Sequence, residues 1–516
     1  MSDTSARDSR MNTTVILNDL LRDKLPSTSM NPKRLFGSLS MSRRPGPHRL
    51  PNELLSYIFL IATRYFEDRY EAILTSITIS HVCSHWREVA ISTGALWTNF
   101  VLTFPSSRSQ LSRTMTWLSR SQPYPIDIHL DFRDPSWDWD ENSHAFQWQD
   151  MEAVLRLFLT HVTRWCHFEL LTDTWAPIFT FLWYARRVKS APMLRSISLS
   201  RCNAYFASKG ATFRPVQLKE PIPLFGGIAL DALRNVSLAG VHVDWARSSL
   251  RHLTRLEFRY HASGVMPSLD QFFDILAGCL DLHHLSIIGW GPQFDKALIH
   301  GNVPGVEAPP AEPQRTIQLR HLTSFSFGFI DINYALKLLS LLSFPAIERL
   351  ALEDVSSTLN PLENQDASPI LDWLTLGRQS GYSATTPRTF RGFSLDGIIS
   401  LQLYRIHSNE ATFSHFISAL PSLRMLGLYD IPDHGIRALH PFDIDHASCP
   451  VLRELECRNV NSAILVDVVR SRAGMEGVSP LDSITFDSSN DLLPATLADR
   501  LSELGIKILF TPFETF

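Results

Sequence analysis

Several histidines and cysteines are spaced closely enough to suggest a metal site. His81 and His85 lie four residues apart with Cys83 between them, so on a helix the two imidazoles would share one face. Zinc needs two more ligands at suitable spacing, and none follow, so polar residues flanking a helix explain them better. His283 and His284 are adjacent, and neighbouring side chains on a strand point to opposite faces, which excludes a shared ion.

The segment 131–150 interleaves Trp137, Trp139 and Trp148 with several acidic residues. Two such acids would suit glycoside hydrolysis, but nothing in the sequence sets their separation. Aromatic side chains in a loop can anchor a partner, although packing of the loop onto the body is the simpler explanation. The sequence has no glycine-rich phosphate loop, nucleophile elbow or HExxH pair. We therefore expect no catalytic residues, no cofactor and no metal.

The stretch 50–100 predicts two or three short amphipathic helices. Pro51 suits a first helical turn, and Gly94 suits the end of the last helix. Apolar residues recur at intervals of three and four, as on one face of a helix. They are Leu54, Leu55, Ile58, Phe59 and Ala62 in the first pattern, and Val82, Trp86, Val89 and Ala90 in the second. Helices this short bury too little surface to stand alone, so we expect a partner to cover them.

This stretch resembles the F-box, a trihelical module that docks an adaptor of the Skp–cullin–F-box ubiquitin ligases. The specific part is its ending, in which Val82-Cys83 and Trp86-Arg87 are followed by Leu96-Trp97. The segment 63–75 is longer and more charged than the family pattern, so the second helix is left open. The resemblance implies adaptor binding by Leu50, Pro51, Leu54, Leu55, Ile58, Phe59, Val82, Cys83, Trp86, Arg87, Leu96 and Trp97, some of which would instead hold the helices together.

Size and composition describe a large soluble protein. At 516 residues the chain is too long for one ordinary core, and 44% apolar with 19% charged residues is typical of globular proteins. A net charge of −4 gives no general attraction to phosphate backbones, which argues against nucleic-acid binding. No apolar run approaches a membrane span, and polar residues interrupt the start, so we expect no membrane association and no secretory signal. With six widely spaced cysteines, we expect reduced thiols in the cytoplasm or nucleus.

A signature of three apolar residues, apolar-x-x-apolar-x-apolar, recurs ten times from Leu194 onward. Its first positions are Leu194, Leu233, Leu253, Leu282, Leu322, Ile347, Ile398, Leu423, Leu452 and Leu481. The last four are separated by 25, 29 and 29 residues, a period typical of leucine-rich repeats. The last two apolar residues of each signature should point inward from a short strand. One repeat cannot bury its own face, so the repeats must stack into a curved parallel sheet backed by helices.

The chain divides into four predicted parts. Residues 1–48 are rich in Ser, Arg, Asn and Pro and predict a disordered tail, and 49–100 form the F-box-like module. In 101–190, strand and helix patterns alternate, which predicts degenerate repeats that start the solenoid. Residues 191–516 carry the repeats, with inserts near 300–316 and 354–392. The first insert is rich in proline, and the second contains a possible helical turn at 370–374.

These patterns together predict an α/β protein with an N-terminal trihelical F-box and a leucine-rich-repeat-like solenoid. The resemblance implies a non-catalytic substrate receptor that binds a Skp-type adaptor, through it a cullin, and a protein target for ubiquitination. The first alternative is a repeat scaffold whose helices cap the array, which would bury Leu54, Ile58 and Phe59 against the first repeat. The second is an enzyme with an unrecognised active site, which a deep pocket of strongly shifted titratable groups would favour.

Overall fold

The computed structural model describes residues 50–65, 69–121, 123–141, 143–201, 207–294, 316–360, 364–376, 394–440, 448–487 and 500–511. The chain forms two compact units, residues 1–51 and 52–516. The first unit is described only at Leu50 and Pro51, and the predicted tail lies outside the described residues. So does the proline-rich stretch 301–313.

The second unit begins with three α-helices and a short 3-10 helix. They are α2 (Asn52–Arg64), α3 (Arg69–His81), α4 (Ser84–Ser92) and η2 (Gly94–Trp97). The three α-helices pack against one another in pairs. The helix that the sequence left open is therefore α3, which starts at Arg69 within the charged segment 63–75. Its apolar residues Ala72, Ile73 and Ile79 are buried.

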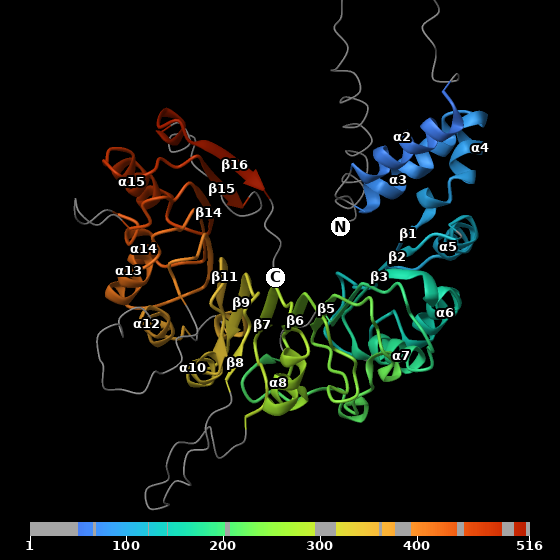
Figure 1. Cartoon of the computed structure of the whole chain (residues 1–516), viewed down its shortest axis with the longest axis horizontal. Helices are drawn as coiled ribbons and strands as arrows, with labels where there is room; N and C mark the ends of the chain where they lie inside the picture. The colour runs from blue at the N-terminus through green and yellow to red at the C-terminus, as the bar shows by residue number, and fades with distance from the viewer. Residues whose placement is uncertain are drawn as a thin grey trace, which may run out of the picture. The chain divides into compact units, whose positions relative to one another are not determined.

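One parallel sheet of 14 strands follows, and each strand pairs with the next one along the chain (Figure 1). Its strands are β1 (Asn99–Thr103), β2 (Ile126–Asp131), β3 (Trp165–Thr172), β4 (Ser196–Arg201), β5 (Asn235–Ala239), β6 (Arg255–Arg259), β7 (His284–Ile288), β9 (Ser324–Phe329), β11 (Arg349–Asp354), β12 (Ser400–Tyr404), β13 (Met425–Tyr429), β14 (Glu454–Arg458), β15 (Ser483–Asp487) and β16 (Lys507–Thr511). A separate pair joins β8 (Ile317–Gln318) and β10 (Leu342–Ser343).

Most connections between strands carry a helix, and these helices lie on one side of the sheet (Figure 1). They are α5 (Arg108–Arg120), α6 (Trp148–Phe158), α7 (Trp175–Ala185), α8 (Leu269–Ala277), α10 (Ile332–Ser340), α11 (Val355–Leu359), α12 (Ser368–Leu376), α13 (Glu410–Ser418), α14 (Asp433–Arg437) and α15 (Ser462–Ala473). The 3-10 helices are η3 (Leu159–Arg164), η5 (Val216–Leu218), η6 (Leu224–Gly227) and η7 (Ser263–Val265). Side-chain caps begin several of the α-helices, since Ser107, Ser268, Asp331, Asn409 and Asn461 each accept a hydrogen bond from a backbone N–H of the first turn.

Each of the ten signatures predicted from the sequence lies on a strand of this sheet. The last two apolar residues of every signature are 2% exposed or less. The register stacks equal positions of neighbouring repeats, for example Leu401 beside Leu426 and Leu426 beside Leu455. The core is thus a set of apolar rows that run across the strands, which confirms the predicted α/β fold class of a repeat solenoid.

Six strands end in the same backbone conformation. The residue directly after β5, β6, β7, β12, β13 and β14 has a positive φ. These residues are Gly240, Tyr260, Gly289, Arg405, Asp430 and Asn459. Gly, Asn and Asp adopt this region readily, whereas it costs a residue such as Tyr or Arg about 1–2 kcal/mol. The turn out of the strand is therefore a property of the repeat, which tertiary packing imposes even on unfavourable residues.

The second predicted insert, 354–392, is only partly an insert. Its start forms α11, and 368–376 form α12, whose residues Ile370 and Leu371 are fully buried. Helix α12 packs against α10 and α13, so this part of the segment belongs to the helical layer. Residues 377–393 lie outside the described part. The final strand, β16, carries none of the ten signatures, and the sequence did not predict it.

Candidate functional site

Helix α2 has two apolar faces, and the other helices of the module cover one of them. Leu55 and Phe59 are each 1% exposed. Leu54, Ile58 and Ile61, which lie on another face of the same helix, are 50%, 45% and 52% exposed. Because residues three and four apart are neighbours on a helix, these three side chains form one stripe.

The buried face of α2 packs on aromatic side chains of α4 and η2. The rings of Phe59 and Trp86 have their centroids 4.9 Å apart. Trp97 is 1% exposed, and its indole N–H donates a 2.8 Å hydrogen bond to the carbonyl of Ala90. Its ring also lies 5.2 Å from that of Trp117 on α5, which ties the helical module to the first strand–helix unit. Burial of these aromatic rings holds the three helices in place.

The twelve residues predicted to bind an adaptor therefore fall into three groups. Leu55, Phe59, Leu96 and Trp97 are buried and hold the module together. Leu50, Cys83 and Trp86 are half-buried, and Pro51, Leu54, Ile58, Val82 and Arg87 are exposed. Only the exposed and half-buried groups can contact a partner without unfolding of the module.

The structure adds exposed apolar residues that the sequence analysis did not single out. They are Tyr57 and Ile61 on α2, Tyr65 directly after it, Tyr70 and Leu74 on α3, and Ile91 on α4. The spacing of Leu54, Ile58, Ile61 and Tyr65 at three and four residues was a visible signal. That spacing alone does not tell which of the two apolar stripes of α2 is exposed and which is buried. We call the exposed apolar residues of α2, α3 and α4 the apolar face.

The positions of His81, Cys83 and His85 are explained by the ends of the helices next to them. Cys83 is the N-cap of α4, and its sulfur accepts a hydrogen bond from the backbone N–H of Trp86 at 3.4 Å. His81 ends α3 and is exposed, and His85 is half-buried. In the segment 131–150, Trp139 is 68% exposed, so packing of the segment onto the body does not account for this side chain.

A polar groove of about 680 Å³ runs over the outward face of β1 to β6. Side chains on a strand alternate between the two faces, so the residues between the buried apolar positions line this groove. They include Ser196, Ser198 and Ser200 of β4, Asn235 and Ser237 of β5, and Arg255, Glu257 and Arg259 of β6. Arg69 of α3 also lines it.

Two carboxylates organise the charges of the groove, the half-buried Glu169 and the buried Glu257. Glu169 on β3 accepts hydrogen bonds from Arg69 at 2.5 Å and His129 at 2.9 Å. Burial opposes its ionisation, but the hydrogen bond and charge of His129, followed by those of Arg69, outweigh burial and lower the pKa of Glu169 to about 2.

Glu257 on β6 lies among four partners. It pairs with Arg255 at 2.6 Å, His284 at 3.2 Å and Arg259 at 3.3 Å, and the Ser237 hydroxyl donates to it at 2.9 Å. Burial again opposes ionisation, but His284 and the two arginines hold the pKa of Glu257 well below its usual range. Both carboxylates therefore stay ionised at neutral pH, which suits binding of polar groups and does not suit general acid catalysis.

Another group of possible metal ligands, Asp127, Cys166 and His167, lies on β2 and β3. Among the described residues, no helix has both the length and the apolar character that crossing a membrane requires.

Comparisons with known proteins add little. No model of a known protein family matches the chain, and no curated protein matches it in sequence. One solved structure that it resembles is the crystal structure of the Rad7 and Elc1 complex in yeast. The two chains share 11% identity, the match covers 94% of each, and the TM-score is 0.35. A similarity this distant carries no argument about function, so the function must be argued from the residues themselves.

Proposed function

We propose that this chain is a non-catalytic substrate-recognition subunit of a Skp–cullin–F-box ubiquitin ligase, active in the cytoplasm or nucleus. In this role the apolar face docks a Skp-type adaptor, which links the chain to a cullin. The repeat sheet holds a protein target near the ubiquitin-charged enzyme. The mechanism is proximity, and the chain itself makes and breaks no bond.

The observation that carries the proposal is the exposure of the apolar face. Leu54, Ile58 and Ile61 leave about half of their side-chain surface in water, on a helix whose other apolar face is already buried. An exposed apolar patch with polar surroundings is typical of a protein–protein interface. The patch lies in the stretch that resembles an adaptor-docking module, which is why an adaptor is the proposed occupant.

The alternative, in which the helices cap the repeat array, predicts a different burial of the same residues. A cap would bury Leu54, Ile58 and Phe59 against the first repeat. Phe59 is buried, but against Trp86 of the module itself, and Leu54 and Ile58 are exposed. The arrangement therefore favours docking over capping.

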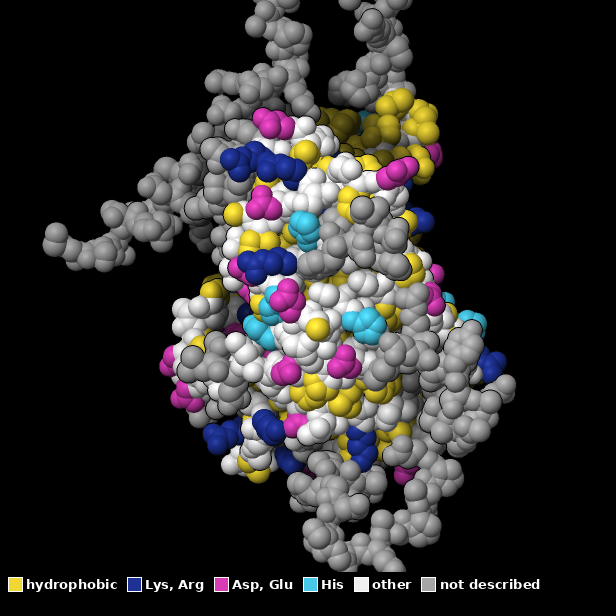
Figure 2. All heavy atoms as spheres, turned by 90° about the vertical axis from the view of Figure 1, so that its left-hand side faces the viewer, with side chains coloured by type: hydrophobic (Ala, Val, Ile, Leu, Met, Phe, Trp, Pro, Cys, Tyr) yellow, Lys and Arg dark blue, Asp and Glu magenta, His cyan; other side chains and the backbone are white. Residues whose placement is uncertain are grey.

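The polar groove supports a binding role for the sheet. The groove is lined by charged residues of both signs. They are Arg69, Arg255 and Arg259, together with Glu169 and Glu257. Figure 2 shows basic and acidic side chains interspersed over a different part of the surface, the left-hand side of Figure 1. Mixed polar surfaces of this kind suit a protein target better than a phosphate backbone.

The adaptor half of the proposal is tested with the purified full chain and a purified Skp-type adaptor. We expect binding by the wild type and loss of binding in a Leu54→Asp/Ile58→Asp double variant. Each substitution places a charge in an apolar interface, so together they should weaken the affinity by more than about 100-fold. Leu280→Asp is the matched control, because Leu280 is an apolar residue 78% exposed on another part of the surface.

Circular dichroism should show the same helix content and unfolding temperature for all three proteins, since every substituted side chain is exposed. No binding by the folded wild type would refute the adaptor role and leave a repeat scaffold. Equal binding by the wild type and the double variant would refute the assignment to α2.

A further inference from the structure

The pairing register of β2 and β3 shifts by one residue near the start of the two strands. Ile126 lies opposite Trp165, but the next residue, Asp127, lies opposite His167. Cys166 is therefore the extra residue of a β-bulge, a feature that re-aims side chains on one strand of a pair. The backbone groups at the bulge are satisfied from both sides, because Asp127 N–H donates to Thr98 at 3.0 Å and the Cys166 carbonyl accepts from Arg195 at 2.8 Å.

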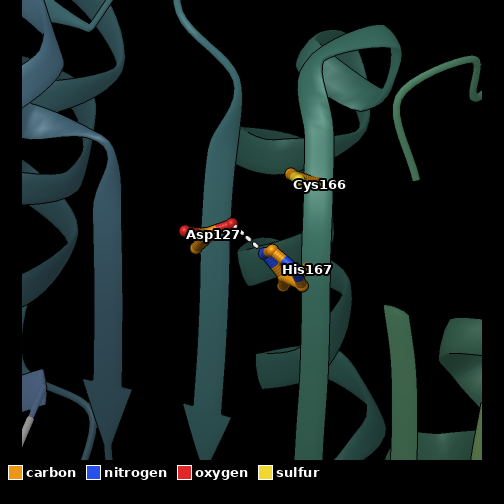
Figure 3. A group of neighbouring side chains, drawn as sticks. All are labelled: Asp127, Cys166 and His167. Carbon is orange, nitrogen blue, oxygen red and sulfur yellow. Dashed lines mark hydrogen bonds and ion pairs between the residues drawn. The ribbon is translucent and has the colours of Figure 1, made fainter. Parts of the chain in front are cut away.

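The bulge brings two metal-binding side chains of β3 to one carboxylate of β2. In a regular strand, adjacent residues such as Cys166 and His167 would point to opposite faces. Figure 3 shows both side chains on the side of β3 that faces β2, with Asp127 beside them. One ligand atom from each of the three residues lies within 4.8 Å of the other two. The Asp127 carboxylate and the His167 Nδ1 are 2.6 Å apart.

These distances are close to those of a metal centre. Zinc binds sulfur at about 2.3 Å and nitrogen or oxygen at about 2.0–2.2 Å, so two ligand atoms of one tetrahedral ion lie about 3–4 Å apart. The carboxylate and the imidazole must separate slightly, and the thiol must approach. The side chains of His167 and Asp127 are 51% and 46% exposed, so side-chain rotation alone can supply both movements.

The donor set identifies the metal. Magnesium and calcium prefer oxygen ligands alone, whereas a thiolate, an imidazole and a carboxylate together suit zinc. We propose that Asp127, Cys166 and His167 form a Zn²⁺ site on the outward face of the sheet, with the fourth position open to water or to a side chain of a bound partner.

Zinc would take the place of the proton that Asp127 and His167 share in their hydrogen bond. That proton moves to the other ring nitrogen of His167, and the thiol of Cys166 gives its own proton to water. The carboxylate and the thiolate then balance the two charges of the ion. Arg195 is an exposed cation whose charge acts on Cys166, and its side chain is long enough to turn into solvent.

The site lies at the polar groove, because Asp127 and His167 both line it. A zinc ion with one open position would offer a bound protein a fixed point of attachment, such as a carboxylate or an imidazole. This inference concerns the chain's own residues and holds whether or not the chain binds a ligase adaptor.

The test uses the full chain, freed of metal with a chelator and titrated with Zn²⁺ or Co²⁺. We expect one ion per chain at this site and, with Co²⁺, a near-ultraviolet thiolate-to-cobalt charge-transfer band. The variants Cys166→Ser and His167→Gln should lose the band or weaken zinc binding at least as much as loss of an outer-shell partner does, about 10–100-fold. Cys83→Ser is the control, since Cys83 is another half-buried free thiol and has histidines near it in sequence.

A folded wild-type chain that gives no charge-transfer band would overturn the proposal by itself, whether or not a variant folds. Zinc binding that is equally strong in Cys166→Ser would overturn it too, because the ion would then be held elsewhere. Loss of the band in Cys83→Ser with retention in Cys166→Ser would place the metal at the helices and refute the site on the sheet.

Discussion

The Glu169 carboxylate on β3 binds both His129 of β2 and Arg69 of α3, so it joins helix α3 to the sheet, and removing its charge should weaken this region in a pH-dependent way. The variant is Glu169→Gln, which keeps the size of the side chain and removes its charge. A pKa of about 2 in the folded chain, against the ordinary value of 4.5, corresponds to about 3 kcal/mol at neutral pH. Glu169 is 27% exposed and Arg69 is 55% exposed, so solvent screening reduces the expected loss to about 1–2 kcal/mol.

The sign of the pH dependence follows from the lowered pKa. The contribution of Glu169 is complete above pH 4.5 and is lost as the pH falls toward 2, because the unfolded chain takes up the proton first. At pH 4 about a quarter of it is lost. The free-energy difference between the wild type and Glu169→Gln should therefore be smaller at pH 4 than at pH 7.

Urea unfolding followed by tryptophan fluorescence measures this difference. The buried rings of Trp97, Trp117 and Trp165 lie in the module and the first repeats, so the signal reports on the affected region. Asp482→Asn is the control, since Asp482 and its partner Arg453 are 58% and 59% exposed and that pair should contribute less than about 1 kcal/mol. An unchanged midpoint in Glu169→Gln at pH 7, or a difference that does not shrink at pH 4, would show that the charge of Glu169 does not stabilise this region through His129 and Arg69.

Three further predictions concern the repeats. Leu426→Ala removes a fully buried side chain from strand β13 and should cost about 2–5 kcal/mol, measured as a lower urea midpoint; a loss below 1 kcal/mol would contradict the packed apolar row. Gly240→Ala should lower the thermal midpoint, because its φ of +62° is unfavourable for alanine and the new Cβ would lie 3.1 Å from the Arg201 carbonyl; an unchanged midpoint would contradict the strain. Burial raises the pKa of the Cys449 thiol to about 12, so alkylation at pH 8 followed by mass spectrometry should find it unmodified in the folded chain and modified in urea, and rapid labelling without denaturant would refute its burial.

The solenoid is the part that the sequence predicted well. Alternation of side chains along a strand is a property of the backbone, so the signature at Leu423, Leu426 and Leu428 identifies a strand and its inward face without knowledge of its neighbours. Repetition at a near-constant period then implies stacking, which the register of the sheet confirms. Strand β16 was not predicted, because it carries none of the ten signatures. Helix α12 was underestimated because its segment has the composition of a loop.

The candidate sites depended on tertiary structure. The sequence placed Leu54, Leu55, Ile58 and Phe59 on one apolar stretch, and only packing against Trp86 decided which of them are buried and which are exposed. Their role in adaptor binding stays a prediction.

What the sequence determined by itself is the periodic part of this protein, because helix and strand periods are local properties of the chain. Tertiary structure decided which apolar face is left uncovered, how the carboxylates of the groove are paired, and where β2 and β3 slip by one residue. The last of these brings Cys166 and His167 to Asp127, which lies some forty residues earlier in the sequence. Such proximity arises from strand pairing, and no spacing within a single stretch of sequence encodes it.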